Sequence, residues 1–73
     1  MDLSRIRERR RALGLTQQDV ADLAGVSVRF LRELERGKAS VRLDGLEAVL
    51  VALGLDIQLV LRAPHPNSFE GET

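Results

Sequence analysis

The chain has no cysteine, no tryptophan and no tyrosine, and its one histidine is His65. The absence of cysteine excludes disulfide bonds, a thiolate nucleophile and a Cys-based zinc site. His65 stands between two prolines, so we expect no metal site, no histidine-based triad and no cofactor. No apolar run approaches the roughly 20 residues that span a bilayer, and the N-terminus is rich in arginine, unlike a signal peptide. These features predict a cytoplasmic protein that is not an enzyme and does not enter a membrane.

The length of 73 residues limits the chain to one small domain. A domain of this size buries roughly 60% of the surface that its unfolded chain exposes, which leaves it only marginally stable. A partner subunit would therefore add to its stability.

Acidic and basic side chains are equal in number, with 11 of each, but they are unevenly distributed. Residues 1–42 contain ten Lys and Arg against six Asp and Glu, whereas residues 43–73 contain one against five. A basic half in a neutral chain favours a local phosphate-binding face. The alternative is an ordinary solvated surface.

The N-terminal residues show the spacing of an amphipathic helix that ends at Gly14. Its core-facing positions are Leu3, Ile6, Arg10 and Leu13. Arg10 is the unusual member, because a buried guanidinium requires a carboxylate or carbonyl partner. Glu35 falls on the inward face of a later helix, so we expect it to pair with Arg10.

Two further helices are predicted on either side of a glycine. One runs from about Gln17 to Ala24, with Thr16 as its N-cap and Asp19 as the acid of a capping box. Its apolar positions are Val20, Leu23 and Ala24. Gly25 ends it in a left-handed conformation. The next helix extends from Ser27, its N-cap, to Arg36, with Leu31 and Leu34 facing inward.

A fourth helix is predicted before Gly54. We expect Leu43 as a hydrophobic staple, Asp44 as the cap and Glu47 as the acid of the first turn. Gly45 is expected to weaken this turn slightly. The helix presents the apolar residues Leu46, Val49, Leu50 and Leu53.

After Gly54 the apolar period changes to two, which predicts a strand over residues 55–62. Its alternating apolar residues are Leu55, Ile57, Leu59 and Leu61. No second strand is predicted in the chain, and a strand with unpaired backbone groups is a template for pairing. We therefore expect it to pair with its copy in a second subunit. The alternative is an extended segment lying across the helices. Residues 63–73 have the composition of a flexible tail, with Phe69 as a candidate anchor.

The segment from Gln17 to Arg36 has the pattern of a helix-turn-helix. Ala21 must be small because two helices cross steeply there, and Gly25 allows the tight turn between them. The segment LTQQDVADLAGVSVRFLRELERGK resembles the XRE-type helix-turn-helix domains of phage repressor and Cro proteins and of bacterial regulators. The resemblance covers residues 3–54. It implies an all-α, lambda-repressor-like fold of four to five helices that binds operator DNA as a homodimer.

The following segment, LGLDIQLVLRA, resembles the end of the antitoxin and autorepressor of HipBA-type toxin–antitoxin modules. In that family the C-terminal strands of two subunits form an intersubunit sheet, and the partner is a HipA-like kinase toxin. We accordingly expect a DNA-binding domain in residues 1–54, a dimerisation strand in residues 55–62 and a flexible tail in residues 63–73.

The resemblance implies that the helix from Ser27 to Arg36 lies in the major groove of DNA. Arg29 has the fork geometry that reads guanine, Val28 can contact a thymine methyl group, and Arg32 can reach a base or a phosphate. Glu33 either accepts from cytosine or pairs with a neighbouring arginine. The expected base-reading residues are therefore Val28, Arg29, Arg32 and Glu33.

Gln17 matches the glutamine that contacts a phosphate in this family, at a helix N-terminus where backbone N–H groups favour an anion. The full set of expected phosphate contacts is Thr16, Gln17, Ser27, Arg36, Lys38, Ser40 and Arg42. Arg5 and Arg9 are weaker candidates, since each also fits an ordinary solvated helix face. Phe30 is expected in the core.

Together these features predict a sequence-specific repressor that binds a palindromic operator as a homodimer, and more narrowly the antitoxin of a HipBA-type module. The alternative is a protein-binding adaptor of the same fold, because Val28 is less polar than most base-reading residues. Nothing in the sequence assembles an activated nucleophile or an acid–base pair.

Overall fold

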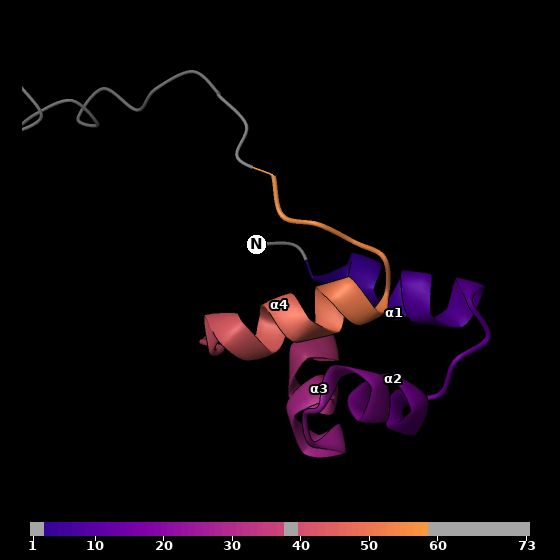
Figure 1. Cartoon of the computed structure of the whole chain (residues 1–73), viewed down its shortest axis with the longest axis horizontal. Coiled ribbons are helices and arrows are strands. Elements are labelled where there is room, and N and C mark those ends of the chain that lie inside the picture. Colours follow the sequence, from indigo (N-terminus) through magenta and orange to yellow (C-terminus); the bar gives the residue numbers. More distant parts are fainter. Residues whose placement is uncertain (1–2, 38–39, 59–73) are drawn as a thin grey trace, which may run out of the picture.

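A computed structural model describes residues 3–37 and 40–58, whose regular elements are all helices (Figure 1). The helices are α1 (Ser4–Ala12), α2 (Gln17–Ala24), α3 (Val28–Glu35) and α4 (Leu43–Ala52). The predicted four-helix architecture is thus confirmed within this part of the chain. None of these helices is long and apolar enough to cross a membrane.

The expected C-terminal strand is described only in its first half. Residues 55–58 belong to no strand in this single chain. Leu59 and Leu61, the tail from residue 63 onward and Lys38 lie outside the described residues. The strand and its pairing with a second subunit therefore remain predictions.

The predicted start and end of α2 are confirmed. Thr16 Oγ1 accepts a hydrogen bond from the Asp19 backbone N–H at 3.0 Å, and Asp19 Oδ2 accepts one from the Thr16 N–H at 2.9 Å. This reciprocal capping box satisfies donors that the first helical turn leaves without partners. The backbone and hydroxyl hydrogen bonds from Thr16 hold the pKa of Asp19 below its ordinary value. Gly25 ends the helix at φ 70°, where a side chain would be strained.

Helix α3 begins after the predicted N-cap residue, whereas α4 begins earlier than predicted. Ser27 Oγ accepts a hydrogen bond from the Phe30 N–H at 3.0 Å. The prediction that Asp44 caps α4 is wrong, because helical geometry already begins at Leu43 and the extended residue before it is Arg42. Asp44 lies inside the first turn, where its Oδ1 accepts from the Gly45 N–H at 2.7 Å. A carboxylate at this end still interacts favourably with the helix dipole.

The core lies between two pairs of helices. In the view of Figure 1, α1 and α4 lie on one side and α2 and α3 on the other. Contacts join α2 to both α3 and α4, and α3 to α1. The core consists of Ile6, Val20, Leu31, Leu34, Leu46, Val49 and Leu53, which are all fully or almost fully buried. These side chains fix α3 from its inner face.

Two leucines expected on core-facing stripes are exposed instead. Leu13 is 44% exposed because α1 ends at Ala12, and half-buried Leu15 packs against the core after the turn. Leu23 is 65% exposed, since α2 buries Val20 and Ala21. The predicted inward placement of both leucines was wrong.

Gly45 has a packing role that sequence reasoning missed. It is buried, and a Cβ at this position would lie 2.5 Å from Cζ of Phe30. Phe30 itself packs against the core, in line with the expectation for it. The glycine that weakens the first turn of α4 therefore makes room for an aromatic ring of α3.

Candidate nucleic-acid interface

The outer face of α3 carries two exposed arginines. The inner face of this helix is buried at Leu31 and Leu34, and Arg29 and Arg32 are exposed on the other side. Val28, at the start of the helix, and Glu33 are half-buried. The four expected base-reading residues thus lie on one helix, and the two arginines are its exposed members among them.

Arg29 interacts with Glu33 one turn later along α3. Their closest charged atoms, Arg29 Nε and Glu33 Oε1, are 3.5 Å apart, and the arginine side chain is 85% exposed. A surface pair of this kind contributes only about 0.3–0.5 kcal/mol. Arg29 can therefore leave Glu33 for a stronger acceptor at little cost.

The N-terminus of α2 is tied to the end of α3 by a side-chain hydrogen bond. Gln17, the first residue of α2, is half-buried, and its Nε2 donates to Glu35 Oε1 at 3.2 Å. The hydroxyl oxygens of Thr16 and Ser27 accept the capping bonds of α2 and α3. The Ser27 hydroxyl also has a hydrogen of its own that it can donate to an anion.

A buried ion pair lies behind Gln17. Arg10 Nε donates to Glu35 Oε2 at 2.7 Å, and Arg10 Nη2 donates to Oε1 at 3.0 Å. The remaining terminal nitrogen, Nη1, donates to the carbonyl of Leu15 at 2.9 Å. The guanidinium is therefore satisfied on every side that faces the protein, which a buried charge requires.

The two partners shift each other's pKa toward the charged forms. The hydrogen bond to Glu35 raises the pKa of Arg10, despite the opposing effect of burial. Burial alone would raise the pKa of Glu35, but hydrogen bonds from Arg10 and Gln17 and the charges of Arg10 and Arg7 together lower it. The carboxylate of Glu35 is consequently ionised at neutral pH.

Further basic and polar groups follow α3. Arg36 and Ser40 are exposed. Arg42 is also exposed, with its Nε 3.6 Å from Asp44 Oδ1 and its guanidinium carbon 6.0 Å from the centre of the Phe30 ring. These contacts are exposed and weak, so Arg42 can exchange them for a phosphate at little cost.

The arginines of α1 that were weaker phosphate candidates have other contacts. Arg9 Nε donates to the carbonyl of Leu53 at 2.9 Å, so it satisfies the C-terminal end of α4. Arg5 lines a hollow beside Leu3 and Leu55. The hydrogen bond from Arg9 ties α1 to the end of α4, a role that the spacing of this residue did not indicate.

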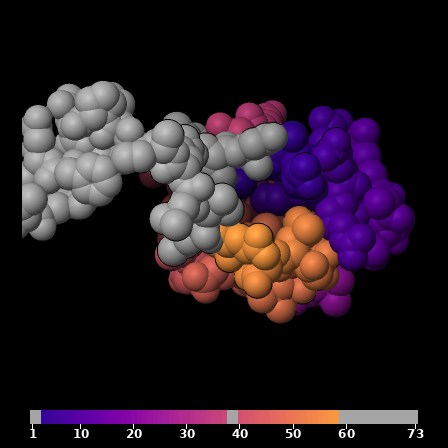
Figure 2. Space-filling model, turned by 90° about the horizontal axis from the view of Figure 1, so that it is seen from above, coloured from indigo at the N-terminus to yellow at the C-terminus, as the bar shows by residue number. Residues whose placement is uncertain are grey.

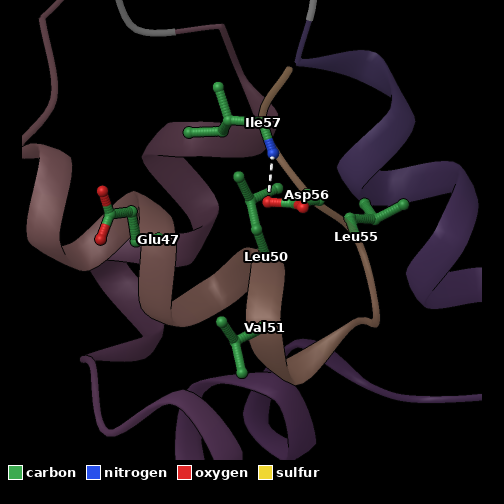
Figure 3. A pocket seen from close by; sticks show the side chains of 6 residues that line it. All are labelled: Glu47, Leu50, Val51, Leu55, Asp56 and Ile57. Carbon is green, nitrogen blue, oxygen red and sulfur yellow. Dashed lines mark hydrogen bonds between the residues drawn. The ribbon is translucent and has the colours of Figure 1, made fainter.

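A second surface is formed by α4 and the segment that follows it. Both are visible, in orange, in the space-filling view of Figure 2. Leu55 packs against the core, whereas Ile57 is 41% exposed and Val51 of α4 is 78% exposed. The surface encloses a hollow of about 330 Å³ (Figure 3), which is lined by Glu47, Leu50, Val51, Leu55, Asp56 and Ile57. The expected dimerisation residues Leu55 and Ile57 both line it.

Comparison with known proteins identifies the family. A curated relative, the HTH-type transcriptional regulator DdrOP3 of Deinococcus deserti, is 35% identical over 57 residues. The match covers 78% of this chain and 44% of the relative, so the chain spans less than half of that protein's length. Residues 6–60 match the helix-turn-helix family. This range contains α1 from Ile6 onward and all of α2, α3 and α4. The protein is therefore a member of the XRE-type helix-turn-helix family.

Proposed function

We propose that this protein is a cytoplasmic, DNA-binding transcriptional repressor that occupies a palindromic operator as a homodimer. The observation that carries the proposal is the geometry of α3. Its apolar face is buried to completion at Leu31 and Leu34, while Arg29 and Arg32 extend from the opposite face. A helix held rigidly in this way suits insertion into a major groove.

The chemistry of the exposed face supports base reading. The planar guanidinium of Arg29 can donate two hydrogen bonds to O6 and N7 of guanine, and its weak pair with Glu33 does not prevent this. Arg32 lies one turn further along, within reach of a base or a phosphate. Val28 offers an apolar contact to a thymine methyl group, and Glu33 either accepts from cytosine or orients Arg29.

Groups that can contact phosphates lie on both sides of α3 in the chain. Before it are Gln17, at the positive end of the α2 dipole, and the hydroxyl groups of Thr16 and Ser27. After it are exposed Arg36, Ser40 and Arg42. We assign Lys38 to the same set from the sequence alone. Contacts on both flanks would fix the register of the helix on the duplex.

The surface of α4 and residues 55–57 supports the homodimer. Val51 and Ile57 expose apolar side chains beside the hollow shown in Figure 3. A second copy would cover them and supply the strand that residues 55–62 need for pairing. A twofold axis at this surface would present two α3 helices to major grooves about 34 Å apart.

The test is a titration of the fragment upstream of the protein's own gene at several salt concentrations. We expect specific binding that weakens steeply with salt, because each phosphate contact releases counterions. Replacing Arg29 by alanine should weaken binding by about 1–3 kcal/mol and relax specificity at one base pair. Arg11→Ala, an exposed arginine on α1, is the matched control. Equal affinity for unrelated DNA, or a flat salt dependence, would contradict the proposal.

A narrower candidate is the antitoxin and autorepressor of a HipBA-type module. The sequence LGLDIQLVLRA and the acidic tail with Phe69 favour it. The test is co-purification with the product of the neighbouring gene, a kinase-like toxin in this hypothesis. Deletion of residues 64–73 that leaves such a complex intact would remove the tail from the argument.

The alternative function is a protein-binding adaptor that does not read DNA. The half-buried, apolar Val28 at the start of α3 favours it. The combined substitution of Arg29 and Arg32 by alanine separates the two functions. A repressor loses DNA affinity, whereas an adaptor shows no selective DNA binding before or after the change.

A further inference from the structure

Glu35 connects three helices through its two carboxylate oxygens. It is the last residue of α3, Arg10 belongs to α1, and Gln17 is the first residue of α2. Oε2 accepts from Arg10 Nε, while Oε1 accepts from both Arg10 Nη2 at 3.0 Å and Gln17 Nε2 at 3.2 Å. The same oxygen therefore serves the buried ion pair and a half-buried side chain at the edge of the candidate interface.

This contact determines how the amide of Gln17 is oriented. A carboxylate only accepts hydrogen bonds, so the amide must turn its NH₂ group, and not its oxygen, toward Glu35. Nε2 has two hydrogens, and one is used here. The second hydrogen remains available to an acceptor beside the N-terminus of α2, such as a phosphate oxygen.

The neighbouring residue Gln18 offers a comparison, because the acceptor of its amide is exposed. Gln18 is exposed and its Nε2 donates at 2.9 Å to Asp22, an exposed carboxylate on the same helix. The side chain of Glu35, in contrast, is only 5% exposed and is held by two hydrogen bonds from Arg10. The ion pair thus fixes the position of the carboxylate oxygen, and this oxygen in turn fixes the position of the Gln17 amide.

We propose that Glu35 is a positioning residue for DNA binding, which, anchored by Arg10, holds the Gln17 amide ready to donate to a backbone phosphate. The inference rests on the proposed function, because it requires DNA at this end of α2. Fixing the side chain before association reduces the rotamer entropy that binding must otherwise remove. The ion pair then contributes to affinity without touching DNA.

The experiment is a double-mutant cycle on the affinity for the upstream DNA fragment. One background is the native chain, and the other carries Arg10→Met together with Glu35→Leu, which replaces the buried pair by apolar groups of similar size. Gln17→Ala is introduced into both, and Gln18→Ala is the matched control. In the native background we expect Gln17→Ala to weaken binding about tenfold, which corresponds to one charge-assisted hydrogen bond. In the replaced background we expect the loss to be about twofold or less.

A single substitution covers the case in which the replaced background does not fold. Gln17→Asn keeps an amide but shortens the side chain by one methylene, so that it cannot reach Glu35 and a phosphate together. We expect it to bind DNA as weakly as Gln17→Ala, with an unchanged salt dependence because no charge is removed.

The outcomes separate this inference from the proposed function. A native chain that does not bind the fragment selectively overturns both. Three results with a native chain that does bind would overturn the positioning role alone. In the first, Gln17→Ala causes equal losses in the two backgrounds; in the second, it causes no loss. In the third, Gln17→Asn binds DNA as tightly as the native chain. Circular dichroism of each variant shows that the compared chains are folded.

Discussion

At the scale of single residues, the most consequential group is the pair of Arg10 and Glu35. Helical spacing placed both residues on inward faces of their helices, and the structure brings them together at 2.7 Å. The spacing of residues along a helix indicates which face a side chain occupies, but not how far away the neighbouring helix lies. The fit of Phe30 against Gly45 was missed for this reason, since it depends on how closely α3 crosses α4.

Removing one partner of the buried pair should be costly. Glu35→Ala leaves the Arg10 guanidinium buried without its carboxylate, so we expect the free energy of unfolding to fall by about 3–5 kcal/mol. Urea denaturation followed by circular dichroism measures this. The Arg10→Met/Glu35→Leu chain is the control, because replacing both partners by apolar groups is often neutral or stabilising. A loss in that control as large as in Glu35→Ala would mean that shape, not charge, dominates the site.

The same pair predicts how stability depends on pH. The pKa of Glu35 is lower in the folded chain than its ordinary value of 4.5, so its ionised form stabilises the fold above that pH. This stabilisation is lost as the pH falls through the folded-state pKa. Asp19 acts in the same direction, because its pKa is also lowered. Urea midpoints at decreasing pH should therefore fall less steeply for the Arg10→Met/Glu35→Leu chain than for the native chain, and parallel curves would contradict the assignment to Glu35.

Packing of Phe30 gives a third test at this scale. Gly45→Ala places a methyl group where the ring now lies, and overpacking of this kind typically costs about 1–3 kcal/mol. Without the ring, alanine is the better helix former by about 1 kcal/mol. In a Phe30→Leu background we therefore expect Gly45→Ala to be neutral or stabilising. Thermal unfolding of the four chains measures the difference, and equal effects in both backgrounds would exclude the ring as the cause.

At the scale of elements, the sequence was most informative where local chemistry decides the geometry. Capping and turn residues predicted α2 and the beginning of α3, because a hydroxyl or a glycine acts on its own backbone within a few residues. The first turn of α4 was less predictable. Asp44 has the better capping side chain, yet the helix begins after Arg42, which makes no side-chain capping bond. Packing of the glycine-containing turn against Phe30 accompanies this earlier start.

The caps of the helix-turn-helix should support both its stability and its function. Thr16→Ala removes the hydroxyl that accepts from Asp19, so we expect a loss of about 1 kcal/mol in the free energy of unfolding. It also frees the helix end that presents Gln17. Ser40→Ala is a matched control, because Ser40 is exposed and outside any helix. Unfolding curves that coincide for the two variants would contradict a role for the cap.

At the scale of the whole molecule, a small core is accompanied by a surface of α4 that exposes apolar side chains. The change of period after Gly54 indicated that the chain leaves the helical layer, and the strand that it predicts would need hydrogen-bonding partners from a second copy. Residues 55–57 instead lie beside α4 and form one wall of the hollow in Figure 3. The proposed dimer would require a second chain, whose presence periodicity can suggest but whose position it cannot give.

If this surface joins two copies, a charge placed on it should separate them. Val51→Asp and Ile57→Asp each introduce a carboxylate beside Glu47 or Asp56, so burial against a second copy would leave that charge unpaired. We expect sedimentation equilibrium to show monomers for both variants and dimers for the native chain, with helical content unchanged. Leu23→Asp, at a leucine of α2 whose exposed fraction lies between those of Val51 and Ile57, should remain dimeric. Because a monomer loses the second half-site, affinity for the full palindrome should fall toward that for one half-site. A native chain that sediments as a monomer, or variants that remain dimeric, would place the subunit contact elsewhere or exclude it.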